Sequence, residues 1–129
     1  MPILAPISAG ELVDKITILR VKAERIDAGK RANVTKELRL LEALAADVLP
    51  DSQKLAVLTA ELTAVNAALW DIEEGKRDCE RRQDFGGDFV RLARAVYLEN
   101  DRRAAIKRAI NDETGSDLVE EKSYQPYRP

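Results

Sequence analysis

The sequence of 129 residues contains no histidine and only one cysteine, Cys79. Without histidine, the chain has no imidazole for acid–base catalysis, for a Ser-His or Cys-His nucleophile pair, or for binding a metal. A single cysteine can form neither an intrachain disulfide nor a thiolate zinc cluster. The chemistry left to this chain therefore uses carboxylates, hydroxyls, lysine and arginine.

Residues that break helices or favour strands are also scarce. The chain has 6 Gly, 5 Pro, one Trp, three Tyr and two Phe, against 45% hydrophobic and 34% charged residues. No segment alternates apolar and polar residues as a half-buried strand does, and there is no internal repeat. This length and composition predict one soluble, helix-rich domain.

Signals for export or membrane insertion are not found either. The first seven residues include two prolines and no basic residue, which is unlike a secretory signal. No uninterrupted apolar stretch approaches the roughly 18 residues that a membrane helix needs. A lone thiol fits a reducing compartment. We therefore expect a cytoplasmic protein with no membrane insertion.

Charge is nearly balanced, at −2 overall, but it is distributed in alternating blocks. Residues 1–36 hold seven Lys/Arg against four Asp/Glu, and residues 37–73 hold two against seven. Residues 74–108 hold ten against seven, and residues 109–129 hold two against five. Because acids interrupt every basic run, we expect no nucleic-acid binding, and we expect neighbouring helices to attract one another.

Apolar periodicity predicts four helices. The first follows a capping box at Ser8–Glu11 and ends near Ala28–Gly29, and the second runs from about residue 34 to 49, with residues 38, 41, 45 and 48 on its buried side. The third runs from about 52 to 84, where one breaker, Gly75, need not end it. The fourth runs from a cap at Asp88 to about 113, with Gly115 at its end. We predict an all-α, elongated antiparallel bundle resembling a coiled-coil hairpin over residues 1–115, with residues 116–129 as a tail packed on it.

The third helix has the most regular pattern, with apolar residues separated by three and four positions in alternation. This seam consists of Leu55, Leu58, Leu62, Val65, Leu69 and Ile72. Its continuation is polar or small, at Lys76, Cys79 and Gln83. On the fourth helix, Phe89, Ala93 and Val96 are likewise followed by Asn100, Arg103 and Lys107. Burying such polar groups without partners costs several kcal/mol, so they must pair, face water or meet a ligand.

A second polar stripe beside the third-helix seam suggests a groove. If the chain turns at Gly86–Gly87, residue numbers that face each other sum to roughly 173, which places Trp70 near Arg103 and Glu73 near Asn100. We therefore expect a cation–π contact of Arg103 on Trp70, with Glu73 also in reach of Arg103. A charged tail segment, Glu120–Tyr124, could close over this groove. The candidate groove residues are Asn66, Trp70, Glu73, Arg77, Arg94, Tyr97, Asn100, Asp101, Arg103, Lys107, Glu121 and Lys122.

Several blocks in a fixed order resemble a small, uncharacterised bacterial family known only as a domain of unknown function. These blocks are Ser8–Leu19, Leu69–Glu73, Phe89–Tyr97 with Asn100–Asp101, Gly115–Ser116 and Glu120–Tyr124. The resemblance covers nearly the whole chain. It implies a context of lipopolysaccharide and surface-polysaccharide genes, and it supplies no catalytic residues.

Two functions from different classes remain open. The first is a helical interaction module, expected to be a homodimer because the long seam is more than so small a chain can bury, with a role accessory to surface-polysaccharide synthesis. The second is a binding or enzymatic groove for an anionic small molecule, such as a nucleotide sugar, a sugar phosphate or a dicarboxylate.

A carboxylate metal site is disfavoured. Asp71, Glu74 and Asp78 share one helix face and could join Glu24 and Asp27, but the usual order of acidic motifs in helical pyrophosphohydrolases is not reproduced. We therefore expect no metal, no cofactor and no assigned catalytic residue.

Overall fold

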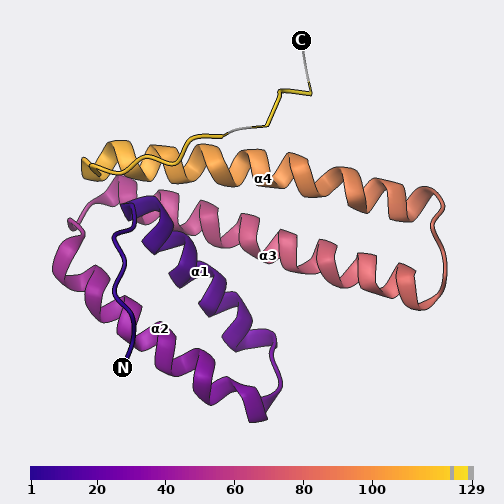
Figure 1. The fold of residues 1–129 in the computed structure, drawn as a ribbon, viewed down its shortest axis with the longest axis horizontal. Helices are drawn as coiled ribbons and strands as arrows, with labels where there is room; N and C mark the ends of the chain where they lie inside the picture. Colours follow the sequence, from indigo (N-terminus) through magenta and orange to yellow (C-terminus); the bar gives the residue numbers. More distant parts are fainter. Residues whose placement is uncertain (123, 128–129) are drawn as a thin grey trace.

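The structure, a computed structural model, describes residues 1–122 and 124–127, and their regular structure consists of four α-helices. These are α1 (Ala9–Arg25), α2 (Ala28–Val48), α3 (Gln53–Arg81) and α4 (Gly87–Thr114). Helices α3 and α4 form a long antiparallel hairpin, and α1 and α2 form a shorter one that diverges from it (Figure 1). The predicted all-α bundle is confirmed.

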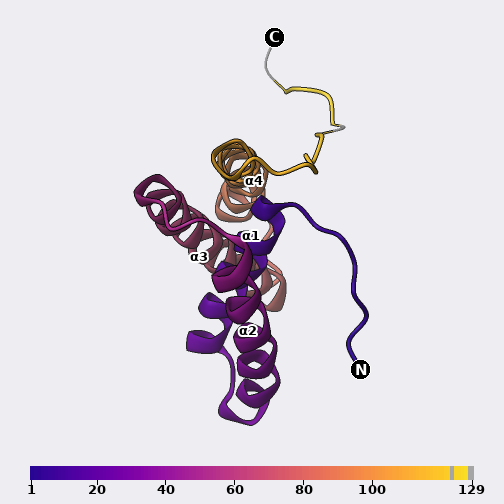
Figure 2. The same cartoon turned by 90° about the vertical axis from the view of Figure 1, so that its left-hand side faces the viewer.

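Helix α1 joins the two hairpins. It packs against α2, α3 and α4, whereas α2 contacts no helix other than α1 within the described residues. Viewed along the hairpin, α1 lies beneath α4 and beside α3, and α2 is the layer farthest from α4 (Figure 2). Opposite charges from the alternating blocks also meet between helices: Arg20 of α1 lies 2.8 Å from Glu42 of α2, and Arg25 lies 2.6 Å from Asp71 of α3.

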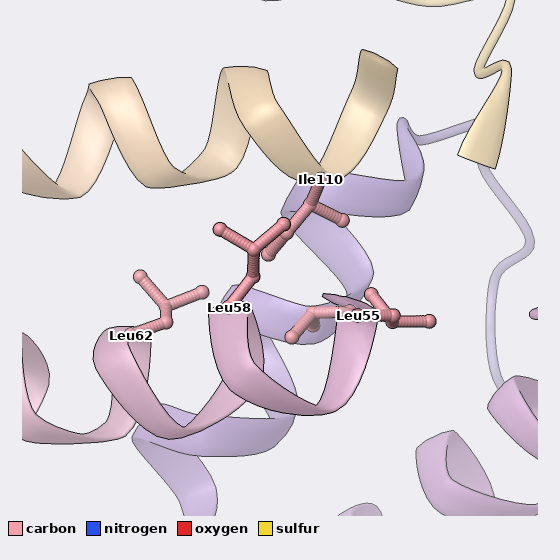
Figure 3. Close-up of a cluster of buried hydrophobic side chains, with 5 residues drawn as sticks. Leu55, Leu58, Leu62 and Ile110 are labelled. Carbon is pink, nitrogen blue, oxygen red and sulfur yellow. The ribbon is translucent and has the colours of Figure 1, made fainter. Parts of the chain in front are cut away.

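The apolar core lies where α1 crosses the α3–α4 hairpin. Val13, Leu55, Leu58, Leu62 and Ile110 form this cluster, and neither Leu62 nor Ile110 is exposed to solvent. Figure 3 shows the leucines of α3 below Ile110 of α4. The first four residues of the third-helix seam are therefore buried within one chain, so this part of the seam leaves no surface for a second copy.

Helix α3 is continuous through Gly75, and a close approach of α4 explains the glycine. A Cβ at Gly75 would lie 3.0 Å from a methyl group of Leu92. The same contact corrects the predicted register. Residues 75 and 92 sum to 167, not 173, because α3 already ends at Arg81 and the chain turns around residue 84 instead of Gly86–Gly87.

Some predicted boundaries and faces are wrong. Gly29 does not end α1 but lies in the first turn of α2. Arg31 donates to the carbonyls of Ala23 and Ile26 and so stabilises the turn between the two helices. Helix α2 thus begins six residues earlier than expected, and Val48, predicted to be buried, is 59% exposed.

Helix caps are predicted in part. Ser8 accepts from the amide of Glu11, as a capping box requires, and Gly115 ends α4 in the left-handed conformation with φ 66°. Helix α4 is capped by Gly86 rather than Asp88.

Helix α3 is long and apolar enough, by length and composition alone, to cross a membrane, and 28% of its most apolar 18-residue window is buried inside the chain. The helix contains no uninterrupted apolar run of this length in the sequence, because charged and polar residues interrupt it. In this structure α3 supplies Leu55, Leu58 and Leu62 to the core, which is also what the central helix of a bundle does.

Candidate functional site

One carboxylate lies in the interior of the bundle. Asp14 on α1 is 0% exposed, and it belongs to a second buried stripe beside the leucines of that helix. The stripe consists of Gly10, Asp14, Thr17 and Val21, spaced by four, three and four residues, so that all four lie on one buried side of the helix. The same periodicity that builds the core therefore carries a charge into it.

Arg103 of α4 holds this carboxylate with a two-pronged contact. Its Nε lies 3.0 Å and 3.1 Å from the two carboxylate oxygens of Asp14, and its Nη2 lies 2.5 Å from Oδ2. Asn66 of α3 donates to Asp14 Oδ1 at 3.0 Å and to Thr17 Oγ1 at 2.9 Å. Three helices thus meet at one acid, and no buried side-chain nitrogen or oxygen among the described residues lacks a hydrogen-bond partner.

Lys107 lies one turn further along α4 and is the second cation of the cluster. Its side chain is only 8% exposed, yet its Nζ lies near three carboxylates. Glu11 is 2.7 Å away, Asp14 is 3.6 Å away and Glu120, from the tail, is 2.6 Å away. Since Asp14 and Glu11 already balance Arg103 and Lys107, Glu120 is a surplus negative charge.

The charges of this cluster are mutually stabilised. Burial alone raises the pKa of Asp14, but hydrogen bonds from Arg103 and Asn66, and the positive charges of Arg103 and Lys107, hold that pKa below its ordinary value. Burial likewise lowers the pKa of Lys107, and its bonds to Glu11 and Glu120 outweigh this and raise it. The hydrogen bond to Asp14 raises the pKa of Arg103. All three groups are therefore charged at neutral pH.

A close backbone approach fixes α1 at this position. The amide of Gly10 donates to the side-chain oxygen of Asn111 at 2.7 Å. A Cβ on Gly10 would lie only 2.5 Å from the backbone oxygen of Lys107, so no larger residue fits without moving a helix. The start of α1 is therefore held directly against the last turns of α4.

The tail follows α4 back from its end as a segment without helix (Figure 1). Besides Glu120 on Lys107, Glu121 lies 3.6 Å from Arg108, and Lys122 pairs with Asp101. The rings of Tyr97 and Tyr127 are 5.1 Å apart. These contacts concern residues 120–122 and 127 of the predicted tail, while Ser123, Arg128 and Pro129 lie outside the described residues.

A pocket of about 1050 Å³ lies between α4 and the tail. Its floor comes from one face of α4, and its other wall comes from the tail. The lining residues are Tyr97, Asn100, Asp101, Arg103, Ala104, Lys107, Glu120, Glu121, Lys122, Tyr124, Gln125, Pro126 and Tyr127. We call this site the tail pocket. It combines aromatic rings with the exposed side of the cation cluster.

Part of the groove predicted from the sequence coincides with the tail pocket. Seven of the twelve candidate residues line it, namely Tyr97, Asn100, Asp101, Arg103, Lys107, Glu121 and Lys122. An eighth, Asn66, lies beneath it, bonded to Asp14. The groove was expected between α3 and α4, but the pocket lies on a different face of α4, because Arg103 turns toward α1.

The remaining four candidates, Trp70, Glu73, Arg77 and Arg94, are not among the lining residues. Glu73 pairs with Lys76 and Arg77 along α3. Arg103 takes Asp14 in place of Trp70, and the structure records no cation–π contact within residues 1–122 and 124–127. The expected Arg103–Trp70 contact is wrong because the register behind it was wrong.

Sequence reasoning did not assign Asp14, Glu11 or Glu120 to the site. The sequence does contain a pattern that indicates a buried acid. Asp14 and Thr17 continue the spacing of four, three and four residues from Gly10 to Val21, and this spacing puts Asp14 on a buried side of α1. Because buried acids require a positive partner, this spacing pointed to a cation on another helix.

Two acids of the disfavoured metal site have other partners. Asp71 pairs with Arg25 and Asp78 with Arg81 and Arg82. In the part of the chain that the structure describes, no group of three or more acidic or cysteine side chains could hold a metal ion.

Fold and site together define an all-α domain in which a buried ion cluster underlies a pocket covered by the C-terminal tail. The chain belongs to the family of unknown function DUF6165, which it matches over residues 3–127. No curated protein and no solved structure matches the chain. The uncharacterised family expected from the ordered sequence blocks is thereby confirmed, and the function has to be argued from the site.

Proposed function

We propose that this domain binds an anionic small molecule of the sugar-phosphate class in the tail pocket. The observation that carries the proposal is the contact of Glu120 with Lys107. Lys107 is nearly buried and has two carboxylate neighbours on α1, whereas Glu120 is 62% exposed and belongs to a segment without helix. Glu120 therefore occupies, from within the chain, a position suited to an external anion.

Exchange of Glu120 for a ligand is energetically inexpensive. Glu120 is exposed, and Glu11 and Asp14 still neutralise Lys107 when Glu120 moves away, so its departure leaves no buried charge unpaired. An entering phosphate or carboxylate restores the charge balance at Lys107. Arg103 offers a further donor, because its bonds to Asp14 use Nε and Nη2 and no described residue accepts from Nη1.

The aromatic side of the pocket indicates what else the ligand carries. Tyr97, Tyr124 and Tyr127 line the pocket, and each offers a flat apolar ring with a hydroxyl at its edge. Such rings suit the faces of a sugar or a base, and the nearby amide of Asn100 can bond to hydroxyl groups. A volume of about 1050 Å³ is at the upper end of the usual range for small-molecule sites. A phosphorylated sugar also fits the surface-polysaccharide context that the sequence resemblance implies, in a bacterial cytoplasm.

The proposal describes binding and assigns no reaction. A thermal-unfolding panel tests it, with inorganic phosphate, glucose 1-phosphate, UDP-glucose and succinate as probes. Lys107→Gln removes the cation, and Arg108→Gln, at the neighbouring exposed residue, is the matched control.

A ligand at 100 times its dissociation constant stabilises the folded state by about 2.7 kcal/mol, which is several degrees here. We expect at least one sugar phosphate to raise the melting temperature of the wild type and of Arg108→Gln but not of Lys107→Gln. No shift with any probe, or an equal shift in folded Lys107→Gln, contradicts the proposal.

A further inference from the structure

Helix α2 presents an apolar face that no other part of the described chain covers. Leu40, Leu44 and Val48 follow one another at intervals of four and are 57%, 45% and 59% exposed. Helix α2 contacts only α1 among the helices, and its outer side is turned away from the rest of the bundle (Figure 2). Exposed leucines at helical spacing, next to one another on one surface, indicate an interaction site.

This face can be defined by its residues. At about 100° per residue, six of them fall within about 120° of the helix circumference. We call this set the α2 face, and it consists of Ala32, Lys36, Leu40, Ala43, Leu44 and Asp47, with Val48 just outside it next to Leu44. A shallow groove of about 670 Å³ follows its edge, lined by Ala32, Lys36, Leu40 and Ala43 among others. Small alanines beside leucines allow another helix to approach closely.

We propose that a second copy of this chain docks on the α2 face, with the two α2 helices antiparallel about a two-fold axis. Charge complementarity within α2 identifies the partner. Between Lys30 and Arg39 the helix holds four basic residues and one acidic residue, and between Leu40 and Val48 it holds two acidic residues and no basic one. An antiparallel copy therefore brings the basic half of each α2 against the acidic half of the other.

The same charges fix the register. When Lys36 lies opposite Asp47 of the second copy, Leu40 lies opposite Ala43 of that copy, and the two-fold axis repeats both contacts. Neither Lys36 nor Asp47 makes an ion pair with a described residue of its own chain, so both are free for this contact. A parallel arrangement would place like charges together. A lipid surface is less suitable, since interfacial helices carry mainly basic residues beside their apolar face.

Helix α2 lies on the side of the molecule away from α4 and the tail, whose residues line the tail pocket (Figure 1). This inference does not depend on ligand binding. It also differs from the dimer expected from the sequence, which relied on the third-helix seam. That seam is buried over Leu55–Val65 within one chain.

Charge reversal in separate chains tests the register directly by sedimentation equilibrium. In Lys36→Asp, each homodimer would hold two facing acid pairs, and in Asp47→Lys, two facing base pairs. We expect the wild type to have twice the chain mass of 14.4 kDa and each single variant to be monomeric. An equimolar mixture of the two variants should again have the dimer mass, because every facing pair in the heterodimer is then of opposite sign.

Two further variants separate the apolar contact from folding. Leu40→Asp should give a folded monomer, since Leu40 is more than half exposed and its loss does not open the core. Val90→Asp, at a comparably exposed valine on α4, is the matched control and should remain a dimer. Circular dichroism verifies that each variant is helical.

Three results would overturn the inference: a monomeric wild type, a dimer that survives Leu40→Asp, or single variants that fail to pair when mixed. Binding of a monomeric wild type to anionic lipid vesicles, lost in Leu40→Asp, would assign the face to a membrane instead.

Discussion

Replacing Asp14 by alanine removes the acid on which three helices converge. Arg103 loses both prongs of its contact, Asn66 loses an acceptor, and Lys107, only 8% exposed, loses a neighbouring negative charge. Removing one partner from a buried ion pair costs about 3–5 kcal/mol, because the other charge stays buried and uncompensated. Whole domains of this size are stable by only about 5–15 kcal/mol. We therefore expect Asp14→Ala to remove a large part of the folding free energy.

This free energy converts into a melting temperature. With an unfolding entropy of about 2.1 cal/mol/K per residue, the 129 residues give about 0.27 kcal/mol/K, so the loss corresponds to about 11–18 °C. Asp71→Ala is the matched control, because Asp71 pairs with Arg25 at 2.6 Å but its side chain is 70% exposed. Such a surface pair contributes about 0–1 kcal/mol.

Calorimetry or circular dichroism measures the melting temperatures of the two variants and of the wild type. If Asp14→Ala costs no more than Asp71→Ala, the buried cluster does not hold the helices together, and our reading of the α1–α4 contact is refuted.

Three further predictions follow from the same contacts. Gly10→Ala should lower the free energy of unfolding, measured in urea, by about 1–3 kcal/mol, because the new Cβ would lie 2.5 Å from the backbone oxygen of Lys107. The control Gly29→Ala, with no atom within 4 Å of its Cβ, should change it by less than about 1 kcal/mol. Gly115→Ala should cost about 1 kcal/mol in the same assay, because φ is 66° at this cap; an unchanged midpoint would mean that the turn adjusts freely. Because the folded-state pKa of Asp14 is lowered, its ionised form stabilises the protein above the unfolded pKa of about 3.9, and this stability is lost as the pH falls through the lower folded value. In urea titrations below about pH 4, the stability of Asp14→Asn should therefore fall less steeply with pH than that of the wild type.

Much of the fold could be predicted from local patterns. The leucine spacing of α3, the cap at Ser8 and the left-handed glycine at 115 each leave a signature within a few residues. The turn between α3 and α4 could not be placed in the same way. The two glycines at 86 and 87 suggested a late turn, but α3 stops at Arg81 and Gln83 adopts a positive φ of 54°. A difference of six in the sum of facing residue numbers was enough to give Arg103 the wrong partner.

The candidate site was predicted on α4 and missed on α1. Asn100, Arg103 and Lys107 were detectable because they interrupt an apolar stripe on their own helix. Asp14, the partner of Arg103 and Lys107, is 89 residues away from Arg103, and no local pattern on either helix specifies which face of α1 meets α4. Pairing across such distances depends on how helices cross, which residue spacing alone does not specify.

The most direct test of the proposed function is a calorimetric titration of glucose 1-phosphate into three proteins: wild type, Glu120→Gln and Glu121→Gln. If Glu120 occupies the position of the ligand at Lys107, removing its charge should tighten binding by about twofold or more, since an exposed ion pair contributes up to about 1 kcal/mol and only Glu120 of this pair is exposed. Glu121, which pairs with Arg108, should leave the affinity unchanged. Unchanged or weaker binding by Glu120→Gln would contradict the account, since Lys107 would then not be the position that the ligand takes.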